Sequence, residues 1–279
     1  MSDGDGFGTV AIAGLGLIGG SLARDLTARG ARVLGHDHDR AAVEQALGDG
    51  AIAGVPGEDG DWEEAEVFVL AVPIGAAAAV LEDVLPRLPR ARLITDVAST
   101  KASIVAAARR LEAGGRFVGA HPLAGDTGSG WSASRAGLFA GARVYLTPSD
   151  ESSPEAVALA RALWTAAGGE IVEMDAGEHD RLLAWTSHLP QVLSSAFAAA
   201  LAGRGIAHGA LGPGGRGVAR LAASPPALWR GILADNAASV AQAIGAVERE
   251  LASIRSALER GDAEAVRGWM EGGRAWGAG

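Results

Sequence analysis

Residues 9–20, Thr-Val-Ala-Ile-Ala-Gly-Leu-Gly-Leu-Ile-Gly-Gly, run from an apolar stretch into a glycine-rich turn, and a helical pattern over residues 21–29 follows. A strand, a tight turn and a helix in this order are typical of the first unit of a dinucleotide-binding domain. Gly14 permits the turn, Gly16 lets the backbone approach a pyrophosphate, and Gly19 lets the helix pack closely on the strand. The N-terminus of that helix presents free N–H groups and a partial positive charge to the phosphates.

An acidic residue stands where this fingerprint requires one. A second strand is predicted over 31–35, and it delivers Asp37, 23 residues after Gly14. A carboxylate here accepts hydrogen bonds from the ribose hydroxyls and repels a 2′-phosphate, so it favours NAD over NADP. Arg40 is the one neighbour that would admit a 2′-phosphate, although we interpret it as a solvated charge. The predicted cofactor-binding residues are Gly14, Leu15, Gly16, Leu17, Ile18, Gly19, Asp37 and Val72.

Composition and charge exclude several classes of protein. A chain of 279 residues, 48% of them apolar and 20% charged, is long enough to bury a core in one large domain or two modest ones. The net charge of −9 argues against nucleic acid or an anionic membrane as a partner. Cysteine is absent, which excludes disulfides and thiolate chemistry. The acidic N-terminus does not resemble a signal peptide, and no apolar run reaches roughly 18 residues, so we expect a soluble, cytoplasmic protein.

Strand and helix patterns alternate along the first part of the chain. Strands are predicted over 10–13, 31–35, 67–71, 92–96, 117–120, 144–147 and 171–174. Between them, helices are predicted over 39–47, 73–85, 101–111 and 154–167. This alternation predicts a Rossmann-type α/β fold, a doubly wound parallel sheet with helices on both faces. We assign residues 1–176 to an NAD-binding domain.

The strand pattern then disappears. Long alanine- and leucine-rich helices are predicted over 177–203 and 226–258, separated by the glycine cluster at 212–215, and a short helix over 263–270 follows. Helices of this composition have little core of their own, so we expect them to be buried against a second copy of the chain. We assign 177–279 to an all-α dimerisation and substrate domain, and we predict a homodimer.

Polar residues follow the predicted strands at the end where a doubly wound sheet binds its ligands. Besides Asp37 these are the segment from Asp96 to Lys101, and His121. A histidine beside a nicotinamide suits the oxidation of a hydroxyl, because imidazole, with a pKa of about 6.5, accepts the hydroxyl proton as hydride leaves. A turn or capping role for His121 and a helix-capping role for Ser99 are the alternatives, and Lys101 is interpreted as a solvated charge.

The second part of the chain holds a smaller set of polar candidates. His179 and His188 are nine residues apart, on opposite sides of a straight helix, so they cannot share one ion and we expect no metal site. His188 and Gln191 share a face, and Pro190 kinks the backbone between them, which suits a helix that lines a cavity. Arg220 is a lone charge in an apolar segment, either a surface charge or a guanidinium that clamps a carboxylate.

At these residues the sequence resembles the prephenate/arogenate dehydrogenase family of tyrosine biosynthesis over nearly its whole length. The resemblance rests on Gly14 to Ser21, Asp96 to Lys101, His121-Pro122-Leu123-Ala124-Gly125 with Ser129-Gly130, Ser187-His188-Leu189-Pro190, and Ala219-Arg220-Leu221-Ala222 with Ser224 and Trp229. Many dehydrogenases share the glycine motif, whereas the His-Pro-Leu-Ala-Gly and Ser-His-Leu-Pro pair is far more specific. The resemblance implies a Rossmann domain joined to a helical dimerisation domain, with the active site between them.

The resemblance also implies roles for single residues. His121 would draw off the proton of the C4 hydroxyl of the substrate ring, and Ser99 would orient that hydroxyl or His121. Hydride would pass from C4 to NAD while the ring carboxylate leaves as carbon dioxide. Arg220 resembles an arginine that holds a substrate carboxylate, and Trp229 a tryptophan that reaches toward the partner's site, although burial at a dimer interface would account for Trp229 as well. The predicted substrate-binding residues are Arg220, His188, Gln191 and Trp229.

Two positions depart from the family's pattern. Many relatives carry histidine at the place of Gln191, which faces the substrate side chain: a keto acid in prephenate and an amino acid in arogenate. Glutamine offers a neutral donor and acceptor, so both substrates stay open. Many relatives also carry a glutamate near Thr127, and no role is carried over to that segment.

The resemblance thus implies NAD-dependent oxidative decarboxylation of prephenate to 4-hydroxyphenylpyruvate, with arogenate dehydrogenation to tyrosine as the alternative. Dehydrogenases of the 3-hydroxyacid type usually rely on a lysine of the second domain, and no lysine occurs from residue 177 onward. A non-catalytic, NAD-sensing dimer would not need Ser99, His121 and Arg220 together.

Overall fold

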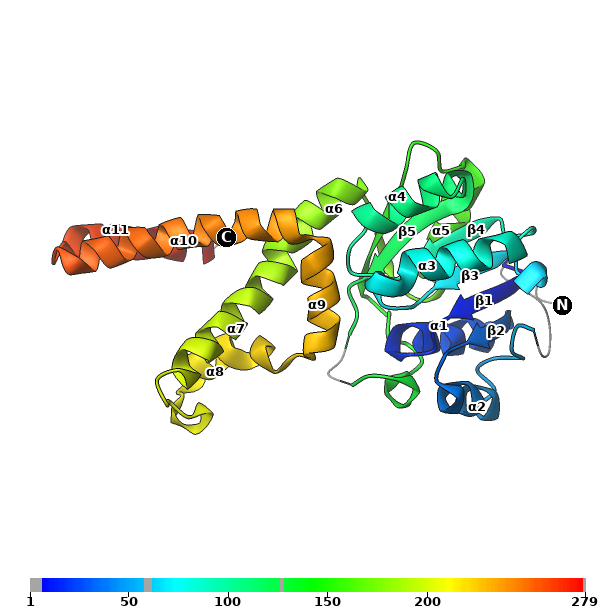
Figure 1. The fold of residues 1–279 in the computed structure, drawn as a ribbon, viewed down its shortest axis with the longest axis horizontal. Coiled ribbons are helices and arrows are strands. Elements are labelled where there is room, and N and C mark those ends of the chain that lie inside the picture. The colour runs from blue at the N-terminus through cyan, green and yellow to red at the C-terminus, as the bar shows by residue number, and fades with distance from the viewer. Residues whose placement is uncertain (1–6, 58–61, 126–127, 278–279) are drawn as a thin grey trace. The chain divides into compact units, whose positions relative to one another are not determined.

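One seven-stranded sheet organises the first part of the chain in the computed structural model, which describes residues 7–57, 62–125 and 128–277 (Figure 1). The strands are β1 (Thr9–Ala13), β2 (Arg32–His36), β3 (Val67–Leu70), β4 (Leu93–Asp96), β5 (Phe117–Pro122), β6 (Arg143–Pro148) and β7 (Glu170–Glu173). Their order in the sheet is β2-β1-β3-β4-β5-β6-β7. All seven strands predicted from the sequence are present.

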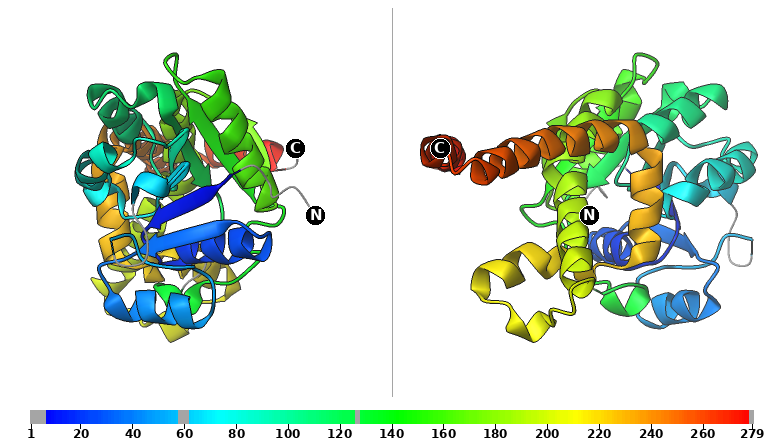
Figure 2. Two further views of the ribbon diagram at one scale, coloured as in Figure 1. Left: turned by 90° about the vertical axis from the view of Figure 1, so that its right-hand side faces the viewer. Right: turned by 60° about the vertical axis from the view of Figure 1, so that its left-hand side comes forward.

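The core divides between the two faces of this sheet because successive side chains of a strand point to opposite sides. Val10 and Ile12 of β1 join one apolar cluster, and Ala11 and Ala13 join the other. The first cluster is covered by α1 (Leu17–Ala28), α2 (Arg40–Gly48) and α5 (Pro154–Ala166), and the second by α3 (Ile74–Val84) and α4 (Ala102–Arg110). The left panel of Figure 2 shows the green α5 and the cyan α3 on opposite sides of the strands. The predicted doubly wound architecture is confirmed.

One strand departs from the predicted parallel sheet. β6 runs antiparallel to β5, with His121 opposite Tyr145, whereas the other neighbouring strands are parallel. A parallel neighbour needs a long crossover, usually a helix. In the described part of the connection from β5 to β6, the regular structure is a single 3₁₀ turn, Trp131–Ala133. The chain therefore turns back beside β5, and α5 then provides the crossover to β7.

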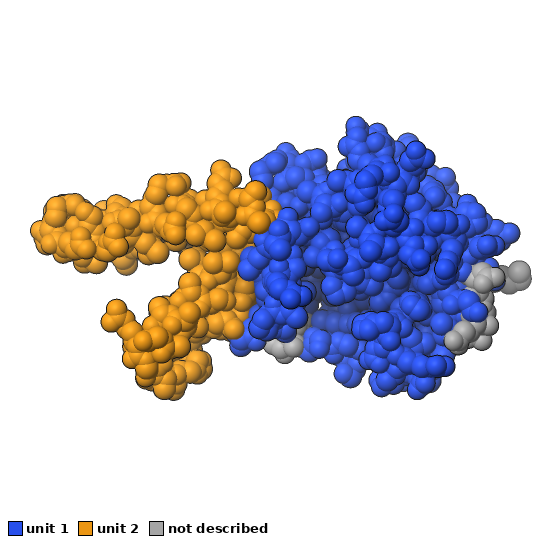
Figure 3. All heavy atoms as spheres, in the orientation of Figure 1, with its two compact units in different colours: residues 1–183, 223–235 blue, residues 184–222, 236–279 orange. Residues whose placement is uncertain are grey.

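The chain divides into two compact units, which Figure 3 colours separately. The sheet unit contains residues 1–183 and 223–235, and the helical unit contains residues 184–222 and 236–279. The sheet unit thus includes two later helices, α6 (Ala176–Leu183) and α9 (Pro226–Asp235). α9 packs on α3, and Asp235 at its end accepts a hydrogen bond from Ser103 Oγ at 2.8 Å. The domain boundary between residues 176 and 177 stays a prediction.

The helices of the helical unit differ in several ways from those predicted. They are α7 (Leu189–Ala202), α8 (Pro213–Ala219), α10 (Ala237–Glu259) and α11 (Ala263–Gly277), preceded by a π-helical turn, Ala184–His188. The single helix predicted over 177–203 is therefore three segments. Pro190 has no N–H to donate to residue 186, and the π-helical turn lies directly before it, where the regular bonding pattern is interrupted.

Two further boundaries were wrong, and one short helix was not predicted. The helix predicted over 226–258 is two helices, α9 and α10, which end and begin on either side of Asn236. The glycine cluster at 212–215 begins α8, because Gly212 is the N-cap and Pro213 is tolerated in a first helical turn. The last helix continues to Gly277 instead of ending near 270.

Large apolar side chains are exposed on the last two helices of the helical unit. Leu251 and Leu258 of α10 are exposed, as are Met270 and Trp276 of α11, and Trp276 keeps 89% of its surface accessible. α10 and α11 pack against each other, so these side chains lie outside that contact. Among the described helices, none combines the length and the apolar character that crossing a membrane requires.

Trp164 on α5 gives a test of the packing of the sheet unit. Its side chain is fully buried and meets Phe139 edge to face, with ring centroids 5.3 Å apart. We expect Trp164→Ala to lower the free energy of unfolding by about 3–5 kcal/mol, because it leaves a cavity in the core. Urea unfolding at fixed protein concentration measures this, with the exposed Leu47→Ala as control, which should change stability by no more than about 0.5 kcal/mol. Equal effects of the two substitutions would contradict the assignment of the core.

Candidate active site

The glycine-rich turn has the backbone that the fingerprint requires. Gly14 has a φ of +98°, and a Cβ placed there would lie 2.3 Å from the carbonyl oxygen of Ala71. A Cβ at Gly19 would lie 2.0 Å from the carbonyl oxygen of Gly14. Gly16, in contrast, is the N-cap of α1 and faces open space. α1 begins at Leu17, four residues earlier than predicted, so its free N–H groups lie next to the turn.

The carboxylate of Asp37 is held against this turn. Asp37 Oδ2 accepts a hydrogen bond from the N–H of Leu15 at 2.7 Å, and Oδ1 accepts one from the N–H of Asp39 at 2.9 Å. Its side chain is 11% exposed. Arg40 is 85% exposed and pairs weakly with Glu44 at 3.8 Å, as expected of a solvated charge. The end of β2 therefore presents an oriented carboxylate beside a helix N-terminus.

The remaining predicted cofactor residues contribute mainly to packing. The side chain of Leu15 is fully buried in the first apolar cluster. Ile18 is partly buried against the same cluster, and Val72, just after β3, is partly buried against the other. Leu17 opens α1 and is partly buried.

Lys101 is the only lysine in the chain, and it is fully buried. Its expected role as a solvated charge is wrong. The ammonium donates to Asp96 Oδ2 and, at 2.8 Å, to the carbonyl oxygen of Ala120. Burial lowers the pKa of Lys101, and the charge of Asp96 opposes that shift. The amine thus ties the end of β4 to the residue that precedes His121.

Asp96 is the last residue of β4, and its carboxylate is hydrogen-bonded to other groups of the protein. Its Oδ2 also accepts the N–H of Ala98 at 2.9 Å, and its Oδ1 accepts the N–H of Ala120 at 3.1 Å. The side chain is buried. A carboxylate that accepts these bonds and pairs with an amine holds two strand ends together.

His121 ends a chain of three hydrogen-bonded side chains. It lies near the end of β5 and is 8% exposed. Its Nδ1 is 2.9 Å from Nε2 of His179, and the two rings meet edge to face. His179 Nδ1 is in turn 2.8 Å from Oδ1 of Asp180. A histidine whose Nδ1 is held by a buried neighbour has its orientation determined by the fold.

Asp180 also binds the N-terminus of α4. The N–H of Lys101 donates to Asp180 Oδ1 at 2.8 Å, and the N–H of Ala102 donates to Oδ2 at 2.9 Å. Burial is the largest single influence on this carboxyl and raises its pKa. Hydrogen bonds from His179 and from the two amides outweigh burial, so the pKa of Asp180 lies below its usual value.

Ser99 does not cap the helix that follows it. Lys101 is the N-cap of α4, and the first two amides are bound by Asp180. The expected capping alternative is therefore wrong. Ser99 lies partly buried in the loop after β4.

Three of the four predicted substrate-binding residues lie in the helical unit. His188 is buried, and its Nδ1 is 3.2 Å from Nδ2 of Asn236. Gln191 is also buried; its Nε2 donates to the carbonyl oxygen of Leu221 at 2.8 Å, and its Oε1 has no hydrogen-bond donor among the described residues. Arg220 is exposed at the end of α8. Trp229 belongs to the sheet unit, partly buried on α9. Thr127 lies outside the described residues.

Sequence reasoning missed His179 and Asp180 as parts of a site. His179 was considered only as a metal ligand, and in the part of the chain that the structure describes, no group of three suitable side chains gathers to hold a metal ion. The dipeptide His179-Asp180 just after the last strand was the available indication, because neighbouring acid and imidazole groups often act together.

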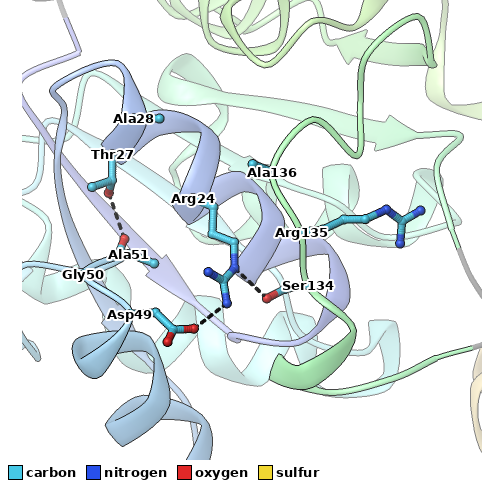
Figure 4. Close-up of a pocket in the computed structure, with 9 residues that line it drawn as sticks. All are labelled: Arg24, Thr27, Ala28, Asp49, Gly50, Ala51, Ser134, Arg135 and Ala136. Carbon is cyan, nitrogen blue, oxygen red and sulfur yellow. Dashed lines mark hydrogen bonds and ion pairs between the residues drawn. The ribbon is translucent and has the colours of Figure 1, made fainter.

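The cavity drawn in Figure 4 is a different place. It has a volume of about 540 Å³ and lies beside the C-terminal half of α1, away from the glycine-rich turn at its start. Arg24, at its centre, donates to Asp49 at 2.7 Å and to Ser134 Oγ at 3.0 Å. The central polar side chains of this cavity bind one another and so link α1 to the segment around Ser134. We therefore do not consider it a candidate active site.

Two family models match the chain. Residues 22–173 match the nucleotide-binding domain of prephenate dehydrogenase, and residues 175–272 match its dimerization domain. The prephenate dehydrogenase of Bacillus subtilis (strain 168) is 33% identical, and the match covers 92% of this chain and 71% of that protein. The chain belongs to the prephenate/arogenate dehydrogenase family.

Solved structures of this family share the fold. Prephenate dehydrogenase from A. aeolicus, in complex with hydroxyphenyl propionate and NAD⁺, matches with a TM-score of 0.87 and 26% identity over 96% of each chain. Synechocystis arogenate dehydrogenase matches with a TM-score of 0.83 and 27% identity over 96% of this chain and 98% of that one. The chain is therefore an oxidoreductase of the prephenate/arogenate dehydrogenase family, with a nucleotide-binding domain followed by a dimerisation domain.

Replacement of the buried amine tests its structural role. Lys101→Met would leave the buried Asp96 carboxylate without its counter-charge and the Ala120 carbonyl without the ammonium, so we expect the free energy of unfolding to fall by about 3–5 kcal/mol. The double variant Asp96→Asn/Lys101→Met should be more stable than Lys101→Met, because it no longer buries an unpaired charge. Urea unfolding measures both, with Arg110→Met, an exposed cation on α4, as control. A Lys101→Met variant as stable as the parent would contradict this role.

Proposed function

We propose that this chain catalyses the NAD-dependent oxidative decarboxylation of prephenate to 4-hydroxyphenylpyruvate, in tyrosine biosynthesis. The observation that carries the proposal is His121, held at the end of β5 by His179, in a chain of the prephenate/arogenate dehydrogenase family. The B. subtilis relative and the A. aeolicus structure are both named prephenate dehydrogenase.

The glycine-rich turn fits NAD as the cofactor. The open space at Gly16 and the helix N-terminus beside it suit a pyrophosphate, and the oriented Asp37 carboxylate suits ribose hydroxyls. The residues that would hold it are Gly14, Leu15, Gly16, Leu17, Ile18, Gly19, Asp37 and Val72. Bound NAD supplies the acceptor for a hydride. The relative from A. aeolicus was crystallised with NAD⁺.

The chain's own residues would accept the proton of the substrate hydroxyl and bind the substrate carboxylate. His121 takes the proton of the C4 hydroxyl as hydride leaves C4, and Ser99 orients that hydroxyl. The electron pair of the bond to the ring carboxylate completes the aromatic ring, and carbon dioxide departs. Arg220, exposed and without an ion-pair partner among the described residues, would hold a substrate carboxylate, while His188 and Trp229 would complete the binding set.

Arogenate is a second candidate substrate, and Gln191 favours it. The side-chain amide is oriented by its Nε2–H bond to the carbonyl of Leu221, so the buried Oε1 is an acceptor that lacks a donor. The ammonium of arogenate would provide such a donor, whereas the keto group of prephenate would not. Prephenate and arogenate differ only in their own side chain, which carries a keto group in prephenate and an ammonium group in arogenate.

The same proposal includes assembly and location. Residues 175–272 match a dimerization domain, and the exposed Leu251, Leu258, Met270 and Trp276 supply apolar surface that a second copy would bury. We therefore propose a homodimer, and we place it in the cytoplasm. Sedimentation gives the mass directly, and a monomer at working concentration would contradict the dimer.

The decisive experiment follows NADH at 340 nm with purified protein, NAD, and either prephenate or arogenate. We expect turnover of at least one, and the ratio of the two kcat/KM values decides between them. Gln191→His should shift that ratio toward prephenate, because a histidine can donate to the keto group. Silence with both substrates, in protein that binds NAD, would exclude the proposed reaction and leave a non-catalytic NAD-binding dimer.

His121→Asn tests the proposed base. We expect kcat to fall by about 10²–10⁴-fold, because asparagine cannot accept the hydroxyl proton, while the Kd for NAD changes little. His208→Asn, an exposed histidine of the helical unit, is the matched control and should keep full activity. A His121→Asn enzyme that retains most of its rate would show that another group takes the proton.

A further inference from the structure

We propose that His179 and Asp180 are positioning residues for His121: they set its tautomer and share the positive charge that it gains in turnover. The proposal rests on the proposed function for the role of His121, but the tautomer itself can be tested without any substrate. All three residues belong to the sheet unit.

The first step concerns Asp180. Its carboxylate accepts hydrogen bonds from the N–H groups of Lys101 and Ala102, at the N-terminus of α4, where a negative charge is favoured. An ionised carboxylate has only acceptor oxygens. Because Oδ1 lies 2.8 Å from Nδ1 of His179, that nitrogen must carry the hydrogen.

The second step passes this constraint to His121. A neutral imidazole with hydrogen on Nδ1 has its lone pair on Nε2. Nε2 of His179 is 2.9 Å from Nδ1 of His121, so Nδ1 of His121 donates. The lone pair of a neutral His121 is therefore on its own Nε2, the nitrogen that acts as the base. His179 is fully buried against the ring of Tyr145, which keeps its orientation.

The third step concerns the charge that turnover creates. When Nε2 of His121 takes the hydroxyl proton, the ring becomes an imidazolium whose Nδ1–H points at Nε2 of His179. Transfer of that second proton to His179 would leave His121 neutral and place the cation beside Asp180. One proton enters the chain from the substrate and none is lost, so the balance holds with either ring charged. Both arrangements are stabilised by the same buried carboxylate.

Other charged and titratable groups surround this chain. Tyr145 lies edge-on to His179 from β6, and Arg143 on the same strand is 3.4 Å from the Tyr145 hydroxyl. On the side of α4 the Lys101–Asp96 pair lies close by, with Asp235 of α9 near Lys101. Asp180 is the carboxylate that contacts His179, so its removal should have the largest effect on the base.

Asp180 also binds the loop that carries Ser99. By accepting the amides of residues 101 and 102, it holds the segment after β4, and Oδ1, which accepts the amide of residue 101, also binds His179. The position of the predicted base and that of the predicted orienting hydroxyl thus depend on one side chain.

Histidine ¹⁵N chemical shifts test the tautomer directly in the unmodified protein. We expect the His121 signals, assigned by their loss in His121→Asn, to show a protonated Nδ1 and an unprotonated Nε2 above the pKa of the ring. The opposite tautomer in the wild-type protein would overturn the proposal. This measurement uses no substrate, so it stands even if neither prephenate nor arogenate is turned over.

The kinetics of Asp180→Asn test whether this carboxylate affects the rate and the pH dependence of turnover. An asparagine amide can donate to His179 and reverse the chain, so we expect kcat to fall by about a hundredfold or more with KM within about twofold. The acid limb of the kcat/KM profile should move to lower pH, because the imidazolium loses its carboxylate. Asp180→Glu should restore part of the rate. Glu178→Gln, an exposed carboxylate on the same helix, is the matched control and should change neither quantity.

Because Asp180→Asn also removes an acceptor from the start of α4, His179→Gln is the second variant. It leaves the Asp180 bonds to α4 in place and removes only the imidazole link. We expect a similar fall in kcat and a similar shift of the acid limb, with unfolding midpoints close to the parent's. An unchanged pH profile and kcat in His179→Gln would overturn the proposal.

Discussion

The Asp180 carboxylate at the start of α4 is the contact on which the arrangement of this site depends. It joins three segments distant in sequence: the loop after β4, helix α6 and, through His179, the end of β5. Backbone amides at a helix N-terminus and a histidine N–H make this charge stable in a buried place. The Lys101–Asp96 pair also stabilises this region, because its amine donates to the carbonyl of Ala120, next to His121. A histidine held by such contacts is oriented before any ligand binds.

The sheet explains why these segments meet. Its central strands β3, β4 and β5 are buried throughout, so polar side chains gather where these strands end. Asp37, Asp96 and His121 each lie at such an end. Both carboxylates accept two backbone amides, but the Asp96 side chain is 1% exposed and pairs with Lys101, whereas Asp37 is 11% exposed. Position at a strand end is therefore not sufficient for a functional role. Burial and the pairing with Lys101 distinguish Asp96 from Asp37.

Much of this was predictable, and the failures have physical reasons. The glycine turn, Asp37 and the seven strands follow local rules, since apolar periodicity and glycine stereochemistry act over a few residues. The burial of Lys101 was not predictable, because nothing nearby in sequence marks the amine's partner on β5. The antiparallel β6 depended on a connection whose described residues contain no crossover helix. The part that His179 plays depended on its contact with His121 of β5, 58 residues away in sequence. Local patterns thus located the turn and His121, while tertiary contacts supplied what holds the histidine.

The buried amine also determines how the surface of this molecule responds to reagents. All but one of its 24 lysine and arginine residues are arginine, and the exception is the enclosed Lys101. Reagents that acylate ε-amino groups would find no accessible lysine on the folded chain, so cross-linking between lysines would report little about its assembly. The same reagents would label this position as soon as β4 and β5 separate. A single lysine thus serves as a built-in chemical indicator of whether the sheet is closed.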